Sequence, residues 1–372
     1  MKALAFLATA IVLSGCGSIH GSSSASTSSQ ASSVRTTATP APTLTPEGPA
    51  SAPRQQIPLP SLPPVARAQV PGCRLPYLKG QAGGTGNLVG GFVEGPQGIW
   101  TADPRGGITK SGNFYVTDVS PTLRGSAFSS WDVGSYDLAL KSWLPVRRSQ
   151  VRGDGLAYAY AEPYKANPSD ALENSTRIHV VSVSDGTDRV VYAGAPRTVV
   201  DFEPEGIYIT AASYYRGEGY GSGLWRLDSA TGAATEIPNG VAFEILYKGV
   251  GWTDNGTIMT HSLVRFDLSS SSQQQWGVDT DNGFAELVGL DSKGNPLVDV
   301  HVFAAPAGAA LFVYNAPQSR TAIASIAVEG LGVTDRHGTW LAGADGIYLL
   351  DANDHLVKVS DETGGTIAGG CN

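Results

Sequence analysis

The sequence has little of the material from which metal and catalytic sites are usually made. Its 372 residues include three cysteines and six histidines. Metal-binding spacings such as His-x-His, Cys-x-x-Cys and His-Glu-x-x-His are absent, and so is the Gly-x-Ser-x-Gly turn that carries the nucleophile in many hydrolases. We therefore expect no metal and no cofactor, and no residue qualifies as catalytic on the sequence alone.

Basic clusters and long apolar runs are missing as well. Lys and Arg number 25 against 33 Asp and Glu, which gives a formal net charge of −8. Nucleic acids and anionic membrane surfaces are bound through clustered Lys and Arg, so neither is an expected partner. The apolar run from Ala3 to Val12 has about half of the roughly 20 residues that a membrane-spanning helix needs.

The first sixteen residues have the form of an export signal. Lys2 supplies the positive start, the apolar run follows, and the small pair Ser14-Gly15 precedes Cys16. The stretch from Leu13 to Cys16 resembles the lipobox of bacterial lipoproteins. This resemblance implies that residues 1–15 are a signal peptide and that Cys16 is the lipid attachment site, acylated on its thiol and its new amino group. The protein would then be anchored in the cell membrane on its extracytoplasmic face; a plain secretory peptide is the alternative.

Residues 16–70 are expected to form a disordered tether. Ser, Thr, Ala and Pro dominate this segment, and large apolar side chains are few. Such a composition cannot bury enough surface to offset the entropy of ordering. A flexible segment of this length spans roughly 40 Å on average, and its prolines extend it further. Whether it is a bare tether, a wall-crossing stalk or an O-glycosylated one, it holds residues 71–372 away from the membrane.

Short apolar strands recur through residues 71–372 at intervals of about 42 residues. Each recurrent strand is usually followed by a polar turn and a second strand, and two further strands precede it. Four strands per repeat, with almost no helical periodicity, predict an all-β fold, a β-propeller with six blades. The six copies of the recurrent strand are 135–138, 178–181, 224–227, 263–266, 311–314 and 347–350.

The repeat also predicts the blade boundaries, at about 89–148, 149–195, 196–238, 239–279, 280–324 and 325–365. Residues 73–88 are left over, and we expect them to add to the last blade or to pack beneath it. A seventh blade would result if they form more strands than we assign. Cys73 and Cys371 lie at opposite ends of this region, and in an oxidising compartment they predict a disulfide that joins the two ends of the ring.

The second repeat resembles that of TolB-like periplasmic propellers. The resemblance rests on Gln150–Ala159 and Arg177–Gly186, with Arg152-Gly153-Asp154-Gly155 in place of the usual Ser-Pro-Asp-Gly turn. It covers one blade well and two or three loosely. It implies the propeller fold and an extracytoplasmic setting, and it carries no function, because propellers host many unrelated activities.

Loop lengths give the only positional indication of a binding site. Connections between the second and third strands of each blade leave a propeller on one face, and three are expected to be long, at about Asp103–Gly134, Glu162–Thr176 and Ser213–Gly223. Their aromatic rings suit stacking on a sugar or clamping a peptide, unless they pack against the blades. The candidate binding residues are Trp131, Tyr164, Tyr214, Tyr215, Arg216, Glu218 and Tyr220.

Two other groups of polar residues are expected to be structural. Asp201, Glu203 and Glu205 lie close together, and paired carboxylates hydrolyse glycosides when they are about 5–10 Å apart. Solvated charge beside a turn is the commoner arrangement, and we expect it here. His179 lies inside an apolar strand, where a hydrogen-bonded structural histidine is commoner than a metal ligand.

These features predict a monomeric, membrane-anchored lipoprotein whose propeller is a binding or scaffold module. Its expected partner is an envelope protein or cell-wall glycan. The rival hypothesis is a propeller lyase or hydrolase that acts on extracellular glycan or peptide, with carboxylates and tyrosines meeting at the central channel. An enzyme requires a titratable cluster at the channel mouth, whereas a scaffold requires only a broad exposed patch.

Overall fold

Short β-strands joined by tight turns make up nearly all of the regular structure. The computed structural model describes residues 59–60, 62–80, 87–127, 133–167, 169, 174–212, 223–254, 261–278, 283–303 and 308–371. All of them belong to one unit, Pro53–Asn372. No α-helix occurs among them, and the one helical element is a 3₁₀ turn, η1, at Arg148–Gln150.

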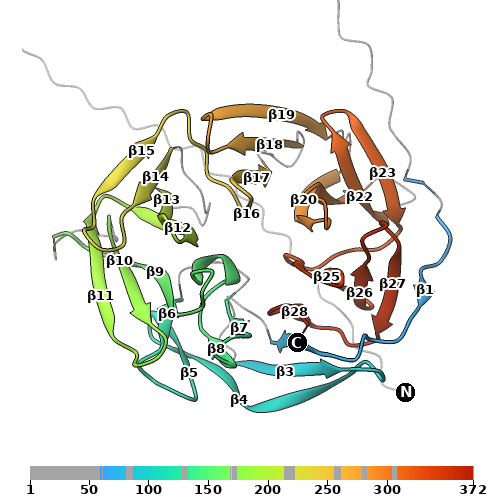
Figure 1. Ribbon diagram of the computed structural model, residues 1–372, viewed down its shortest axis with the longest axis horizontal. Coiled ribbons are helices and arrows are strands. Elements are labelled where there is room, and N and C mark those ends of the chain that lie inside the picture. The colour runs from blue at the N-terminus through green and yellow to red at the C-terminus, as the bar shows by residue number, and fades with distance from the viewer. Residues whose placement is uncertain are drawn as a thin grey trace, which may run out of the picture. The chain divides into compact units, whose positions relative to one another are not determined.

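Six sheets of three or more strands follow one another around a ring (Figure 1). The first sheet contains β2 (Arg74–Lys79), β3 (Leu88–Glu94), β4 (Ile99–Ser111), β5 (Phe114–Thr117), β6 (Arg124–Ser126) and β28 (Gly365–Ile367). The second contains β9 (Ala157–Tyr164), β10 (Ser175–Ser182) and β11 (Asp188–Gly194). The third contains β12 (Arg197–Glu203), β13 (Gly206–Ala211), β14 (Leu224–Leu227) and β15 (Ala234–Ile237).

The fourth sheet contains β16 (Ile245–Tyr247), β17 (Val250–Asp254), β18 (His261–Asp267) and β19 (Ser272–Val278). The fifth contains β20 (Gly283–Leu290), β21 (Pro296–Val302), β22 (Gly308–Ala316) and β23 (Ser319–Ala324). The sixth contains β24 (Val333–Asp335), β25 (Gly338–Gly343), β26 (Gly346–Leu350), β27 (Leu356–Ser360) and β1 (Ala66–Arg67). A separate hairpin is formed by β7 (Ser135–Asp137) and β8 (Ser142–Leu144).

This arrangement is a six-bladed β-propeller, as the sequence repeat predicts. In the third to fifth sheets the first strand lies nearest the axis and the fourth lies outside, with β15, β19 and β23 on the outer rim (Figure 1). Four of the six recurrent strands are third strands of their blades, namely β14, β18, β22 and β26, and β10 is the middle strand of the three-stranded second sheet. β10 lies next to the outer strand β11, as the third strands lie next to the fourth. The repeat therefore predicts the position of the recurrent strand within the blade correctly for blades two to six.

The first blade differs from the prediction. The segment 135–138, expected to be its third strand, contributes β7 to the separate hairpin. Residues 73–88, which lie outside the six predicted blades, contain β2. This strand pairs on one side with β3 and on the other with β28. The prediction that they would join the last blade or pack beneath it is wrong, and no seventh blade forms among the described residues. The repeat could not reveal this, because one blade is assembled from both ends of the chain.

Residues 65–68, which lie within the predicted tether, contact the propeller. Ala66 and Arg67 form β1, which pairs in parallel with β27 along the outer edge of the sixth sheet (Figure 1). The Ala68 amide donates to the Lys358 carbonyl at 3.0 Å, and Val65 packs against a cluster shared by the fifth and sixth blades. Covering an exposed strand edge removes a surface prone to aggregation, which gives these residues a structural role.

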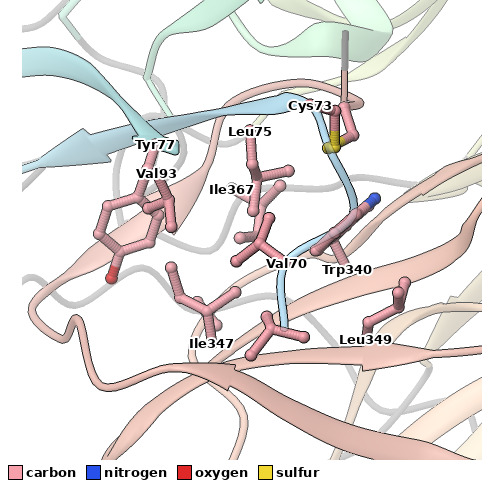
Figure 2. Packing of buried hydrophobic residues seen from close by; sticks show 12 residues of the cluster. Val70, Cys73, Leu75, Tyr77, Val93, Trp340, Ile347, Leu349 and Ile367 are labelled. Atoms are coloured by element: carbon pink, nitrogen blue, oxygen red, sulfur yellow. A yellow bond between two sulfur atoms is a disulfide. The ribbon is translucent and has the colours of Figure 1, made fainter. Parts of the chain in front are cut away.

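The hydrophobic core is divided among the contacts between neighbouring sheets. Where the two ends of the ring meet, Val70, Leu75 and Tyr77 from the start of the propeller pack against Trp340 and Ile367 from its end (Figure 2). The hairpin formed by β7 and β8 packs closely on the first sheet. A Cβ at Gly90 would lie 2.6 Å from the Trp143 ring, so only glycine permits this approach.

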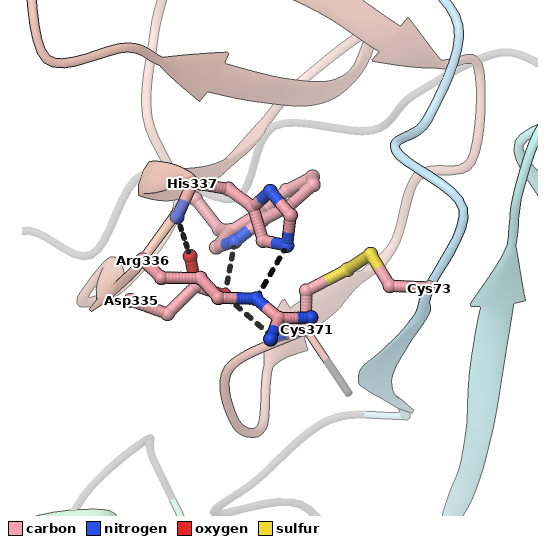
Figure 3. The surroundings of a disulfide bond; sticks show 6 residues. Cys73, Asp335, Arg336, His337 and Cys371 are labelled. Carbon is pink, nitrogen blue, oxygen red and sulfur yellow. Dashed lines mark hydrogen bonds between the residues drawn. A yellow bond between two sulfur atoms is a disulfide. The ribbon is translucent and has the colours of Figure 1, made fainter.

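The predicted disulfide between Cys73 and Cys371 is present beside this cluster (Figure 3). The two cysteines are 298 residues apart in sequence. The Asp335 Oδ2 atom accepts hydrogen bonds from the Cys371 amide at 2.6 Å and from the Trp340 indole at 2.8 Å. The last residues of the chain are therefore held both covalently and by the sixth blade.

Replacing both Cys73 and Cys371 by Ala should lower the free energy of unfolding by about 2–5 kcal/mol, because the bridge restricts a very long loop in the unfolded chain. Guanidinium unfolding without reductant measures the difference. A reductant should bring the wild-type midpoint to that of the double variant and leave the variant unchanged. Equal wild-type midpoints with and without reductant would contradict a stabilising role for the bridge.

Candidate functional site

A cavity of about 350 Å³ lies where the inner strands of the blades converge. It is lined by the last residues of β12, β20 and β28, together with β16, β24 and the segment around η1. All six blades contribute to the lining. Five of them present an inner strand, and the second blade presents the segment around η1, which precedes β9. Its size falls at the lower end of the range typical of small-ligand pockets.

Two arginines enter the cavity from the turn before the second blade. Arg147 precedes η1 and Arg148 begins it, and both side chains belong to the lining. The Arg148 Nη1 atom lies 3.5 Å from Oδ2 of Asp137, a buried carboxylate on β7. The other oxygen of Asp137 accepts the Leu140 amide at 2.8 Å. Arg148 therefore already has a protein counter-ion.

Asp201 is a buried carboxyl group that lines the cavity. It lies near the end of β12, and only 7% of its surface is exposed. Burial raises its pKa to about 8, and the negative charges of Glu203 and Glu205 add to the effect. The Phe202 amide and the charge of Arg148 oppose the shift. In the described part of the chain, no Lys, Arg or His forms an ion pair with Asp201.

Glu203 lies two residues further on and also lines the cavity. Burial, followed by the charge of Glu205, raises its pKa above the usual range. Glu205 is outside the lining and accepts a hydrogen bond from the Tyr208 hydroxyl at 3.3 Å. One acidic side of the cavity therefore contains two neighbouring carboxyl groups, and the pKa of each is raised.

The remaining lining is largely apolar. Asp291, at the turn after β20, is fully engaged there, since its carboxylate accepts the Lys293 and Asn295 amides, each at 2.8 Å, and the Asn295 side chain. The apolar surface comes from Ile245, Leu246, Tyr247, Leu290, Leu331, Val333 and Ile367. A ligand that fits this cavity would combine an apolar body with a charged group directed toward the third blade.

The cavity lies at the opposite end of the third blade from its longest loop. Glu203 pairs with Gly206 at the turn between β12 and β13, whereas Arg197 pairs with Ala211, directly before the connection 212–223. Six residues of extended strand separate these ends by about 20 Å. The cavity and the predicted binding loops therefore mark two different faces of the blade.

Most of the predicted site residues lie outside the described residues. This holds for Cys16, Trp131, Tyr214, Tyr215, Arg216, Glu218 and Tyr220, whose roles remain predictions. Tyr164 is the last residue of β9 and is half-buried, with the Arg177 guanidinium 4.2 Å from the centre of its ring. It contacts its own blade and takes no part in the lining of the cavity.

Two expectations about this region are wrong. The segment Asp103–Gly134, expected to be a long loop, contains most of β4 with all of β5 and β6, and its Tyr115 is fully buried. Asp201, expected to be a solvated charge, is buried and lines the cavity. The sequence held one indication of this position. Asp201 lies near the end of an apolar strand, and the repeat makes that strand the first of its blade.

His179 is the hydrogen-bonded structural residue that the sequence predicted. Its Nδ1 atom lies 2.7 Å from Asp188 and its Nε2 atom 3.1 Å from Glu162. Its ring stacks on Tyr160, with 4.6 Å between the ring centroids. Both ring nitrogens are engaged within the second sheet, so neither is available to a ligand.

One group of potential metal ligands lies together in the described ranges. The sulfur atoms of Cys73 and Cys371 and a ring nitrogen of His337 lie within 4.8 Å of one another (Figure 3). Because the two sulfurs are bonded to each other, neither is a thiolate, which is the form that binds metals. Over the same ranges no helix is long and apolar enough to cross a membrane.

Comparison with known proteins finds similarity in structure only. No protein-family model matches the chain, and no curated protein matches its sequence. TolB from Acinetobacter baumannii is 11% identical, with a TM-score of 0.43 over 80% of this chain and 67% of that chain. A protein from Lactobacillus plantarum is also 11% identical, with a TM-score of 0.45 over 79% of this chain and 98% of that one.

The propeller domain of the Trilobed protease from Pyrococcus furiosus is 14% identical, with a TM-score of 0.39 over 57% of this chain and 71% of that chain. A TolB protein is thus among the similar solved structures. Likeness at this level of identity concerns the fold and carries no activity or ligand.

Replacing Asp201 by Asn should change the pH dependence of stability. The folded chain keeps this proton up to a pKa of about 8, while the unfolded chain loses it near the ordinary value of 3.8. Wild-type stability should therefore fall as the pH rises between these values, by at most about 1.4 kcal/mol per pH unit from this group. Urea unfolding at pH 5 and pH 8 measures the fall.

In the Asp201→Asn variant this contribution should disappear, so the variant should gain on the wild type between pH 5 and pH 8. The exposed Glu236 provides a matched control, since Glu236→Gln should keep the wild-type dependence. Parallel pH profiles for the wild type and Asp201→Asn would contradict a buried, protonated Asp201.

Proposed function

We propose that this protein is an extracytoplasmic lipoprotein, anchored through Cys16, whose propeller is a binding module for an envelope component. The leader sequence supports the anchoring and the export. The observation that carries the binding role is the cavity at the ring axis, which combines apolar walls with a buried carboxyl group that forms no ion pair with any described residue. Pockets of this composition bind ligands by shape and by a few polar contacts.

An envelope protein is the partner that the cavity favours, and cell-wall glycan is the alternative. The described lining has many apolar side chains and two aromatic residues, Tyr247 and Phe202, and Phe202 is buried in the core of the third blade. Glycan sites usually present several stacked rings. A peptide segment offers apolar side chains and charged groups together, which matches the lining. The propeller acts as a monomer in this proposal.

Blocking the cavity tests this function. Ser149 lines the cavity and is half-buried, so Ser149→Trp should fill part of it, while Ser319→Trp places the same side chain on the exposed edge strand β23. The purified chain is incubated separately with cell-wall sacculi and with solubilised envelope proteins. We expect retention by the protein fraction for the wild type and Ser319→Trp, and at least a tenfold loss for Ser149→Trp.

Retention on sacculi alone would assign the site to glycan. Loss of sacculus binding on changing Tyr214, Tyr215 and Tyr220 to Ala, with Ser149→Trp still bound, would move the site to the loop of the third blade. No retention in either fraction, or equal retention of Ser149→Trp, would refute the cavity as a binding site.

An enzymatic role is favoured by one observation. Asp201, with a pKa of about 8, is protonated at neutral pH, as a general acid must be, and Glu203 lies beside it. On this hypothesis the protein is a hydrolase or lyase acting on extracellular glycan or peptide. Release of fragments from sacculi or peptides by the wild type, abolished in Asp201→Asn, would support it, and intact substrates would refute it.

A further inference from the structure

We propose that the cavity takes a lysine or arginine side chain of the bound protein, with the Asp201 carboxylate as its counter-ion. This inference rests on the proposed binding function and specifies the chemistry of its ligand. Asp201 is more than nine-tenths buried, lines the cavity and has no ion pair with the described residues. Ionising a buried carboxyl group without a cation is costly, and the cost is offset if a ligand supplies the cation.

The charged groups around the cavity favour a cation over an anion. Of the other charged groups in the lining, Arg148 is paired with Asp137, and Asp291 is held by its own turn. Glu203 adds negative charge without an ion pair in the described ranges. The full set of charged lining groups is Arg147 and Arg148 beside η1, Asp201 and Glu203 on β12, Glu244 before β16 and Asp291 after β20. Glu205 lies just outside the lining.

The apolar part of the lining fits the stem of such a side chain. Lysine and arginine bury their methylene groups on apolar surface while the charged head reaches a polar partner. Leu290, Val333 and Ile367 supply apolar surface from the fifth, sixth and first blades, and Asp201 lies on the third. A side chain that enters along the axis would contact the apolar walls with its stem and the carboxylate with its head.

Binding of this cation should release a proton. At neutral pH the Asp201 carboxyl carries its proton, and an ammonium group pairs only with the ionised form. The proton passes from Asp201 to the buffer, while the ligand keeps its own charge. Affinity should therefore rise by up to tenfold per pH unit below the pKa of Asp201 and level off above it.

Two peptides test the inference on the full chain. Acetyl-Leu-Lys-Leu-amide carries the cation, and acetyl-Leu-norleucine-Leu-amide replaces it with an apolar chain of similar shape. Calorimetry at pH 7 in two buffers of different ionisation enthalpy measures both affinity and proton release. We expect the lysine peptide to bind at least tenfold more tightly, with release of close to one proton at pH 7 and almost none at pH 9.

The variant Asp201→Asn should abolish this preference and the proton release, while Glu236→Gln should leave both unchanged. The asparagine oxygen can still accept the Phe202 amide, and the unfolding measurements above show whether the variant is folded. Equal affinity for the two peptides, or an unchanged preference in Asp201→Asn, would overturn the cation site and leave a binding cavity in place. No binding of either peptide would also overturn it, and the retention experiment then decides separately whether the cavity binds a partner.

Discussion

Pairing of β28 with β2 is the contact on which the whole ring depends. Each blade is a sheet of antiparallel strands, with the parallel strand β1 added to the sixth, and it packs against its neighbours, so an open row of blades would leave two sheet faces exposed. The last strand of the chain closes the row by becoming the inner strand of the first blade, with Tyr77 opposite Ile367. The disulfide, the Asp335 hydrogen bonds and the core around Trp340 all lie at this closure.

The axial cavity is a direct consequence of that closure. Six inner strands directed at one axis cannot fill the space between them with backbone, so their side chains decide what the space contains. Here most of the walls are apolar, and one side carries Asp201 and Glu203. The fold supplies the position of the site, and a few residues at the ends of the inner strands supply its chemistry.

The repeat in the sequence was sufficient to predict the fold and five of the six blades. Third strands such as β14 and β22 are mostly apolar, and polar turns separate them from the fourth strands, so the spacing of the repeat can be recognised in the sequence. The first blade was missed because its strands come from both ends of the chain, and no local pattern records that pairing. The disulfide was predictable because only two cysteines remain in the folded region.

The site was harder to predict, because burial is a property of the assembled ring. In the sequence alone, Asp201 and Glu203 have the pattern of solvated charges beside a turn. Only the assembled ring shows that they line a cavity among the inner strands. Loop length, from which Tyr214 and its neighbours were predicted as binding residues, indicates one face of the propeller. It gives no information about the residues that line the central axis. Arg148 and Tyr247 belong to no recognisable sequence motif. They line the same cavity as Asp201 only because the ring brings their blades together.

The position of β1 has a mechanical consequence. The chain reaches the ring along the outer edge of the sixth blade, pairs with β27 over two residues, and continues through Val70 to Cys73. Tension applied to the chain before residue 59 would act first on the contacts of Leu59 and Pro60 with the fifth blade, and then on the few hydrogen bonds of β1. Beyond them the load meets Cys73, whose sulfur is bonded to Cys371. The pull would then be shared by both ends of the ring at the point where they are already joined.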